Sequence, residues 1–445
     1  MSFREKTWGL RFRLREMSSR SWLVIPCLYV VGALALGRIV PELVGDGAGP
    51  IFGLTLAPDS ARGILEAVAG GMITFTGLVV SVAVVVVQFG AGQYTPRLVL
   101  LFRRDHVVKH SLGIFIAPAL YALVCLGDVK STTNQESATL TVAVAVVLLV
   151  AAVIAFFALT ARLLDLLRPR RLFAQLREGG THAIDVVYPH FWSDDADDLD
   201  RLPTGGQPIF YDGPEGVLSA LDLARLTETA RIGDVVIEVA WRIGGYVRTG
   251  AMIFVIYGEA DRVDIDQLRR SAIIAEERTL TQDPAFAIRT IVDIAIRALS
   301  PAVNDPTTGS QALDTLEPML HRLSTRNLGT GFLHDADRIA RVAYPAATWV
   351  DLLDLSLTEI RHYGAGSHQI ARRMRSVLLG LLEDCPPPRR AEVERHLSLL
   401  DAAVERSFAS EEERAIALTP DHIGLGGRHR QPPESDLGFD TENQL

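Results

Sequence analysis

The sequence predicts a membrane protein with four spanning α-helices followed by an α+β domain on the cytoplasmic side of the membrane. Three observations predict this fold class. Four long apolar runs lie in the first third of the 445-residue chain, basic residues alternate between their flanks, and the composition becomes that of a soluble domain from about Arg168. Hydrophobic residues make up 48% of the chain, and the apolar runs account for this high share.

Each apolar run approaches the length that is needed to cross a bilayer. About 20 apolar residues in a helix cross a hydrocarbon core of roughly 30 Å. We predict a transmembrane domain over residues 1–167, with spans over about 22–40, 64–88, 111–127 and 140–160. The runs are rich in valine, but an open sheet would leave unpaired backbone groups in lipid, so we expect helices. Pro118 predicts a kink in the third span.

Basic residues in the short flanks predict the orientation of the spans. They gather in the N-terminal segment, in the loop after the second span and after the fourth span: Arg4, Lys6, Arg11, Arg13, Arg15, Arg20, Arg97, Arg103, Arg104, Lys109, Arg162, Arg168, Arg170, Arg171 and Arg177. The other two loops carry only Arg62 and Lys130. We therefore expect both termini in the cytoplasm of a bacterial cell. A cleaved signal peptide is the competing interpretation of the first run, which is longer than a signal-peptide core and continues into Val40-Pro41-Glu42.

One face of the second span carries small or weakly polar residues. At about 100° per residue, they fall within one narrow stripe of the helix: Gly63, Glu66, Gly70, Thr74, Gly77, Ser81 and Gln88. Small residues allow helices to approach closely in lipid, which makes this stripe a candidate packing face. A weakly polar face also lines water-filled paths, with Val84 as a candidate apolar constriction. Both interpretations hold if the protein forms a homo-oligomer around this helix.

The cytoplasmic domain is predicted to begin with a β-rich module over residues 168–263. Short strands are expected over 209–211, 216–219, 234–240 and 252–257, with a helix over about 221–230. Their order resembles the shape of the barrel-sandwich modules of biotinyl and lipoyl carriers, but this stretch contains no lysine to carry a cofactor. The resemblance is therefore one of shape and does not include the cofactor.

A helical domain is expected over residues 264–423 and a disordered tail over 424–445. Apolar and charged residues alternate at helical spacing in six segments: 266–277, 284–299, Thr307 or Thr308 to Leu323, 346–362, 368–383 and 389–406. In the third of these, Thr307 or Thr308 is the expected N-terminal cap. The tail has few apolar residues and two adjacent prolines.

The segment around the predicted helix 284–299 concentrates polar side chains at its two ends. Its candidate ligand residues are Arg278, Asp283, Arg297, Asn304 and Asp305. One interpretation is a site for a phosphate or a cation; the other is a set of turns that fixes a helix hairpin. Asp293 is spaced to form an ion pair with Arg297.

Other polar clusters predict neither a metal site nor a cofactor. The acidic run Asp194 to Asp200 lacks the glycine and glutamate of a calcium loop, and His106 and His110 have no third ligand nearby in the sequence. The three cysteines, Cys27, Cys125 and Cys385, are too widely spaced for a metal site, and we expect them to be reduced.

Several longer motifs resemble one family. They are Gln88-Phe89 through Tyr94-Thr95-Pro96-Arg97, Phe102 to Asp105, Ser111-Leu112-Gly113-Ile114-Phe115, Gly244-Gly245-Tyr246-Val247, Gln282-Asp283-Pro284, and Ala298-Leu299-Ser300-Pro301 to Asn304-Asp305-Pro306. Together they resemble the bacterial predicted-membrane-protein family called domain of unknown function 2254, over about Arg15 to Arg414. The chain departs from the family pattern at Tyr94-Thr95 and at Lys109-His110. The resemblance implies membrane residence and no established activity, so it carries over no site residues.

Three classes of function therefore stay open. The first is a channel or transporter subunit whose second span lines the path and whose cytoplasmic domain gates or assembles it. The second is a membrane-anchored regulatory or scaffold protein that binds a protein partner or small ligand through that domain. The third, an enzyme acting on a lipid or cytoplasmic substrate, lacks a recognisable catalytic set, and we expect no enzymatic activity. Nucleic acid is not an expected partner, because the net charge is −9 and the basic clusters lie where anionic lipids would meet them.

Overall fold

The computed structural model describes residues 23–43, 56–93, 105–129, 135–166, 168–192, 202–328 and 331–425. These residues belong to two compact units, Met1–Leu172 and Phe173–Leu445. Most of the described residues are helical, and the second unit also holds a mixed α/β region. Some sequence predictions fall outside the described residues: the N-terminal arginines, the loop with Arg97, Arg103 and Arg104, Lys130, the acidic run 194–200 and the tail from 426 onward.

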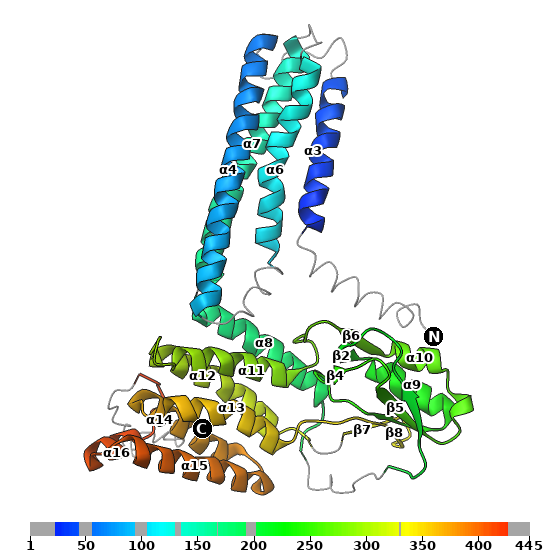
Figure 1. The fold of residues 1–445 in the computed structure, drawn as a ribbon, viewed down its shortest axis with the longest axis vertical. Helices are drawn as coiled ribbons and strands as arrows, with labels where there is room; N and C mark the ends of the chain where they lie inside the picture. Colours follow the sequence, from blue (N-terminus) through cyan, green and yellow to red (C-terminus); the bar gives the residue numbers. More distant parts are fainter. Residues whose placement is uncertain are drawn as a thin grey trace, which may run out of the picture. The chain divides into compact units, whose positions relative to one another are not determined.

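The described residues of the first unit include four helices that are long and apolar enough to cross a membrane. They are α3 (Val24–Leu43), α4 (Pro58–Gln93), α6 (His106–Val129) and α7 (Gln135–Leu166) (Figure 1). All four predicted spans are helices; α4, α6 and α7 extend beyond the predicted limits at both ends, whereas α3 begins at Val24 and extends beyond its limit only at the C-terminal end. With 36 residues, α4 is about 54 Å long at 1.5 Å per residue, which exceeds the hydrocarbon core.

Helix α6 packs against each of the other three helices and supplies much of the buried core. Its Gly113 lies against the ring of Tyr29 on α3, and a Cβ at Gly113 would overlap that ring. Helix α3 in turn has a glycine, Gly37, against Val124 of α6. A Cβ at Gly37 would lie 2.9 Å from the Cβ of Val124. Small residues thus allow α3 and α6 to approach closely, as is usual for helices in lipid.

In the described part of the second unit, eight strands form two sheets. The larger has the order β1 (Gln207–Phe210), β5 (Met252–Tyr257), β3 (Val236–Val239), β8 (Ala340–Ala343) and β7 (Phe332–His334), and the smaller has the order β4 (Tyr246–Val247), β2 (Gly216–Leu221) and β6 (Ala272–Ala275). Only the pairing of β3 with β8 is parallel. Three short helical elements connect these strands: α9 (Leu223–Gly233), η3 (Ala260–Arg262) and α10 (Ile265–Arg270).

The structure corrects the predicted helix over 266–277. Helix α10 ends at Arg270, and the next residues form β6, which pairs with β2. The physical reason is tertiary: Ile273 and Ile274 are β-branched and fit a buried strand beside β2 better than a helix. Strands β7 and β8 were also not predicted, and they bring residues beyond 263 into the larger sheet.

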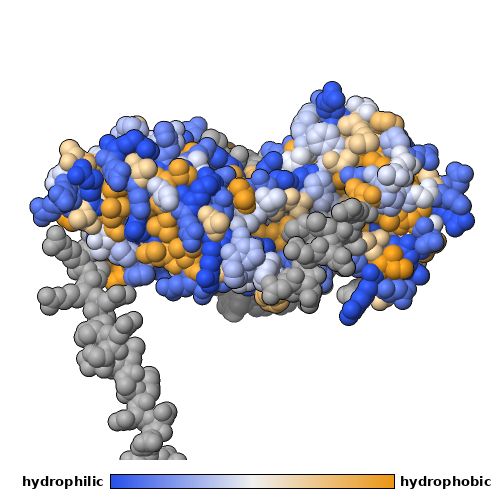
Figure 2. All heavy atoms as spheres, turned by 90° about the horizontal axis from the view of Figure 1, so that it is seen from below, coloured by the Kyte–Doolittle hydropathy of each residue, from blue (hydrophilic) through white to orange (hydrophobic). Residues whose placement is uncertain are grey.

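The remainder of the second unit is a helical layer around a buried core. It contains α8 (Pro169–Val187), α11 (Pro284–Ala298), α12 (Pro306–Ser324), α13 (Trp349–Gly364), α14 (His368–Asp384), α15 (Pro387–Ser407) and α16 (Glu411–Ala417) (Figure 1). Gly180 of α8 lies directly against Ala287 of α11 and Met319 of α12, so a side chain at position 180 would separate these helices. On the face of this unit in Figure 2, hydrophobic residues lie in separate groups among hydrophilic ones.

The C-terminal boundary also differs from the prediction. Gly424, expected to begin the disordered tail, accepts hydrogen bonds through its carbonyl oxygen from the Ser310 hydroxyl (3.1 Å) and the Gln369 side-chain amide (2.6 Å). Ser376 and His422 are joined by a further hydrogen bond of 2.8 Å. These bonds hold the segment that follows α16 against α12 and α14.

Candidate functional site

The small-residue stripe of α4 is exposed in the single chain. Gly70, Thr74, Gly77, Ser81 and Gln88 all lie on the surface of the first unit. Among the described residues, nothing lies within 4 Å of a Cβ placed at either glycine. The opposite face of α4 packs into the core through Leu65, Val68, Ala69, Met72 and Val79. The stripe therefore faces away from the other three helices of its own chain.

The hydroxyl groups of the stripe are bonded within the helix. Thr74 donates to the Gly70 carbonyl oxygen (3.1 Å), and Ser81 donates to the Gly77 carbonyl oxygen (2.8 Å). Val84 lies on the same face and is 44% exposed. The side chains of the stripe are therefore small and weakly polar, and the hydroxyl groups of Thr74 and Ser81 already have acceptors within the helix. At the start of α4, Glu66 forms an exposed ion pair with Arg62 at 2.9 Å.

The five candidate residues around α11 do not form one site. Arg278 and Asp283 lie at its N-terminal end, whereas Arg297, Asn304 and Asp305 lie at its C-terminal end. Asp283 caps the 15-residue helix and Arg297 is its second-last residue, so the two lie about 21 Å apart along the axis at 1.5 Å per residue. The two groups therefore make separate local structures.

Asp283 is the N-cap of α11 and is 3% exposed. It accepts a hydrogen bond from the Phe286 backbone N–H (2.9 Å), while burial raises the pKa of its carboxyl group. Among the described residues its Oδ2 atom has no hydrogen-bond partner, although Arg278 Nη1 lies 3.9 Å away. Arg278 also donates to the Gly244 carbonyl oxygen at 2.7 Å. This arrangement joins the Gly244-Gly245 turn to the start of α11.

Asp305 corrects the predicted cap of α12. It accepts hydrogen bonds from the Thr308 backbone N–H (3.1 Å) and hydroxyl (2.6 Å), so Asp305, and neither Thr307 nor Thr308, is the cap. Asn304 reaches the left-handed region with φ of 49°, and the turn closes when Asp305 N donates to the Ala298 carbonyl oxygen (2.8 Å). The aspartate before Pro306 is favoured as the cap because its carboxylate reaches the free N–H groups of the first turn.

The ion pair of Asp293 forms one turn earlier in the helix than the spacing predicted. Asp293 pairs with Arg289 at 2.6 Å, and Arg289 also reaches Glu359 of α13 at 2.7 Å. Arg297 is exposed. Both arginines are four residues from Asp293, and the additional carboxylate on α13 favours Arg289.

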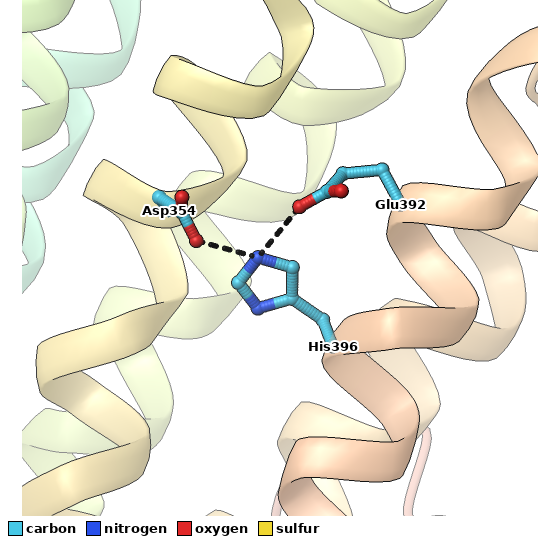
Figure 3. A group of neighbouring side chains, drawn as sticks. All are labelled: Asp354, Glu392 and His396. Carbon is cyan, nitrogen blue, oxygen red and sulfur yellow. Dashed lines mark ion pairs between the residues drawn. The ribbon is translucent and has the colours of Figure 1, made fainter.

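A cluster of Asp354, Glu392 and His396 was not identified in the sequence. Glu392 and His396 lie one turn apart on α15, while Asp354 comes from α13 (Figure 3). His396 Nε2 is 3.2 Å from Asp354 Oδ1 and 3.7 Å from Glu392 Oε1. The spacing of Glu392 and His396 was the only signal in the sequence, because Asp354 approaches through tertiary packing.

Two arginines complete this cluster and account for its charges. An arginine faces each ring nitrogen of His396: Arg361 lies 3.1 Å from Nδ1 and Arg395 lies 3.3 Å from Nε2. Arg395 donates to Asp354 (2.6 Å) and to Glu392 (2.7 Å). A metal ion bound between Nε2, Asp354 and Glu392 would have to displace Arg395, which contacts all three. The donor set thus fits a charge-balanced hydrogen-bond network better than a metal site.

A surface hollow of about 750 Å³ lies beside α12 and α14. Its lining residues are Phe191, Asp314, Glu317, Pro318, His321, Arg322, Thr325, Arg326 and Asp384. His321 Nδ1 is 2.9 Å from Asp384 Oδ2, whereas Arg322 and Arg326 both bind the Asp185 carboxylate, at 2.6 and 2.7 Å. Arg322 lowers the pKa of Asp185 through this bond. The two arginines therefore share one carboxylate, which balances only one of their two positive charges.

Four candidate spans joined to a mixed α/β unit define a membrane protein, and the comparisons with known proteins agree. The sequence model of the family described as "Predicted membrane protein (DUF2254)" matches residues 19–379, and the chain belongs to this family. This result confirms the resemblance that the sequence motifs indicated.

Relatives of the chain occur in mycobacteria. Uncharacterized proteins of Mycobacterium bovis and Mycobacterium tuberculosis (strain H37Rv) are each 28% identical to it over 394 residues, which cover 86% of this chain and 74% of the relative. No solved structure matches the chain.

Proposed function

We propose that the chain is a subunit of a homo-oligomeric channel or transporter in a bacterial cell membrane, with the stripe of α4 lining the path. The observation that carries this proposal is the exposure of Gly70, Thr74, Gly77, Ser81 and Gln88 on a helix whose other face is fixed in the core. Contact with another helix or with water suits a weakly polar surface better than contact with hydrocarbon. In an oligomer it faces either another copy or water.

The oriented topology belongs to the same proposal. Both termini are placed in the cytoplasm because arginines and lysines gather at the N-terminus, in the loop after α4 and after α7. In that orientation the second unit is cytoplasmic and able to gate or assemble the path. A reporter fused after Arg171 is expected to be active only in the cytoplasm, and activity in the periplasm would contradict the topology.

Solute flux into liposomes that contain the purified full chain tests the proposed path. We expect Gly77→Leu to lower conductance at least about tenfold, because a large side chain would enter the path. Gly71→Leu is the matched control: Gly71 is also exposed on α4 with open space around it among the described residues, but it lies about 100° from the stripe. Its flux is expected to stay within about twofold of the parent. Absence of conductance in the parent under voltage, stretch or candidate ligands would contradict the proposal.

A membrane-anchored regulatory or scaffold protein is the second candidate function. It is favoured by Phe210 and Met252, which face each other on adjacent strands β1 and β5 and are 51% and 40% exposed. Large exposed apolar side chains on neighbouring strands are suited to a protein partner. Co-purification from the native cell tests this function, since a partner should be lost from a Phe210→Ser, Met252→Ser double variant.

The proposal includes neither an enzymatic reaction nor a nucleic-acid partner. Asp283 and Asp305, the acids of the only candidate set in the sequence, serve as helix caps, which supports a structural role. The test compares the parent with the triple variant Asp283→Ala, Asn304→Ala and Asp305→Ala. If the parent catalyses a reaction and the folded variant does not, the chain is an enzyme and these residues belong to its active site.

A further inference from the structure

An apolar crevice opens between α3 and α7 in the first unit. It has a volume of about 350 Å³ and is lined by five residues of α3, one of α6 and one of α7: Leu28, Tyr29, Gly32, Ala33, Leu36, Ala117 and Leu148. Three of its lining residues, Gly32, Ala33 and Ala117, are small, so little side-chain volume fills the space. Helix α3 is held by α6 on one side through Tyr29 against Gly113.

The crevice is unsuited to water. A buried water needs two to four polar partners, and the phenol of Tyr29 is the only polar side-chain group in the lining. That hydroxyl is already bonded to His110 Nδ1 at 3.1 Å. Dry cavities of about 150 Å³ bind a benzene-sized apolar molecule, and this crevice is more than twice as large. An empty crevice would forfeit the dispersion contacts of its walls.

The crevice is continuous with the apolar exterior of the unit. Leu28 and Leu36 form part of its lining and are also 65% and 41% exposed. In a membrane protein this exterior faces hydrocarbon. We propose that an acyl chain of a membrane lipid occupies the crevice and fills the space between α3 and α7. This inference concerns a site separate from the α4 stripe and does not depend on the proposed path.

Two of the lining residues make the proposal testable. Ala33 and Ala117 are 5% and 6% exposed, so lipid that merely surrounds the protein does not reach them. A phospholipid with a photoactivatable diazirine in its acyl chain is incorporated into bilayers with the full-length chain, and the labelled residues are mapped by mass spectrometry. We expect label at Ala33 and Ala117 in addition to outward residues such as Val150.

The variant Gly32→Phe should fill the crevice without disturbing the core, because among the described residues nothing lies within 4 Å of a Cβ at Gly32. Label at Ala33 and Ala117 is expected to fall about tenfold, while label at Val150 stays unchanged. Gly127→Phe is the control on α6, where a Cβ also meets open space, and it should leave all labelling within about twofold. Native mass spectrometry of the parent identifies the retained molecule, since the adduct mass separates a phospholipid from a free fatty acid.

Three results would overturn the proposal. Label confined to outward residues, with none at Ala33 and Ala117, would mean that no acyl chain enters the crevice. Equal label at these alanines in the parent and in Gly32→Phe would place the lipid elsewhere. Disulfide cross-linking of two copies through Gly32→Cys, beyond that of the parent with its native Cys27, would show that a second copy fills the space instead.

Discussion

At the scale of single residues, buried charges decide how the second unit responds to pH. His396 is fully buried, and burial together with Arg395 and Arg361 lowers its pKa from 6.5 to about 4. The folded chain therefore does not take up the proton that the unfolded chain binds below pH 6.5. The contribution of the neutral His396 to the free energy of unfolding is fully present above pH 6.5. It falls by up to roughly 3 kcal/mol as the pH decreases from 6.5 to 4.

Urea denaturation of the purified chain at several pH values measures this dependence. The control is His396→Gln, which does not titrate and should remove most of the slope between pH 6.5 and 4. The carboxylates that face the imidazole, Asp354 and Glu392, are present in both proteins, so the comparison isolates the imidazole. A parent slope equal to that of His396→Gln would show that His396 is protonated normally in the folded chain.

Gly244 carries a second residue-scale prediction. Its φ is +87°, and a Cβ there would lie 2.5 Å from Asp283 Oδ2. Gly244→Ala is therefore expected to lower the free energy of unfolding by about 3 kcal/mol, from backbone strain and from displacement of the buried carboxylate. Gly250→Ala is the matched control, because its φ of +78° is similar and a Cβ there meets none of the described residues within 4 Å. It should lose only about 1 kcal/mol, and equal losses in thermal or urea unfolding would disprove the close approach.

At the scale of elements, the C-terminal end of α12 depends on an arginine from another helix. Arg389 of α15 donates to the carbonyl oxygens of Leu323 (2.8 Å), Ser324 (2.6 Å) and Arg326 (2.6 Å). These carbonyls have no continuing helix to bond them, and a cation at a helix C-terminus is also favoured by the helix dipole. Burial lowers the pKa of Arg389 to about 10, so it keeps its charge at neutral pH.

Replacing this arginine should loosen α12 from α15. We expect Arg389→Met to lower the free energy of unfolding by about 3 kcal/mol, because the carbonyl oxygens of Ser324 and Arg326 lose their donor and that of Leu323 loses one of its donors. The neighbouring Arg390 is exposed, and Arg390→Met should change stability by less than about 0.5 kcal/mol. Hydrogen exchange of α12 locates the effect, and protection that is unchanged in Arg389→Met would contradict this role.

The elements also show what the sequence could predict. The helices α11, α14 and α15 follow a clear alternation of apolar and charged residues, and they agree with their predicted limits within a few residues. Strand β6 was not predicted, because it forms by pairing with β2, which lies more than fifty residues earlier in the chain. The separation of the candidate residues around α11 into two groups was also not evident in the sequence, because residues close in sequence lie at opposite ends of the helix between them. Conversely, Asp354 and His396 are distant in sequence and meet only through packing of α13 on α15.

At the scale of the whole molecule, the α4 stripe predicts association between copies of the chain. Gly77 faces away from its own helices, and small residues permit close approach of a second α4. We expect Gly77→Cys, with Cys27→Ser to remove the exposed native thiol, to form a disulfide between copies under mild oxidation. Gly71→Cys in the same background is the control and should cross-link at least about fivefold less, since it points about 100° away.

The same two cysteines separate a packing face from a wet one. A membrane-impermeant thiol reagent needs water to reach its target, so rapid modification at position 77 with slow modification at position 71 indicates that the stripe lines an aqueous path. Efficient cross-linking at position 77 without modification indicates dry contact between α4 helices. If position 77 neither cross-links nor reacts more than position 71, the stripe faces lipid, and both the homo-oligomer and the path through it are wrong.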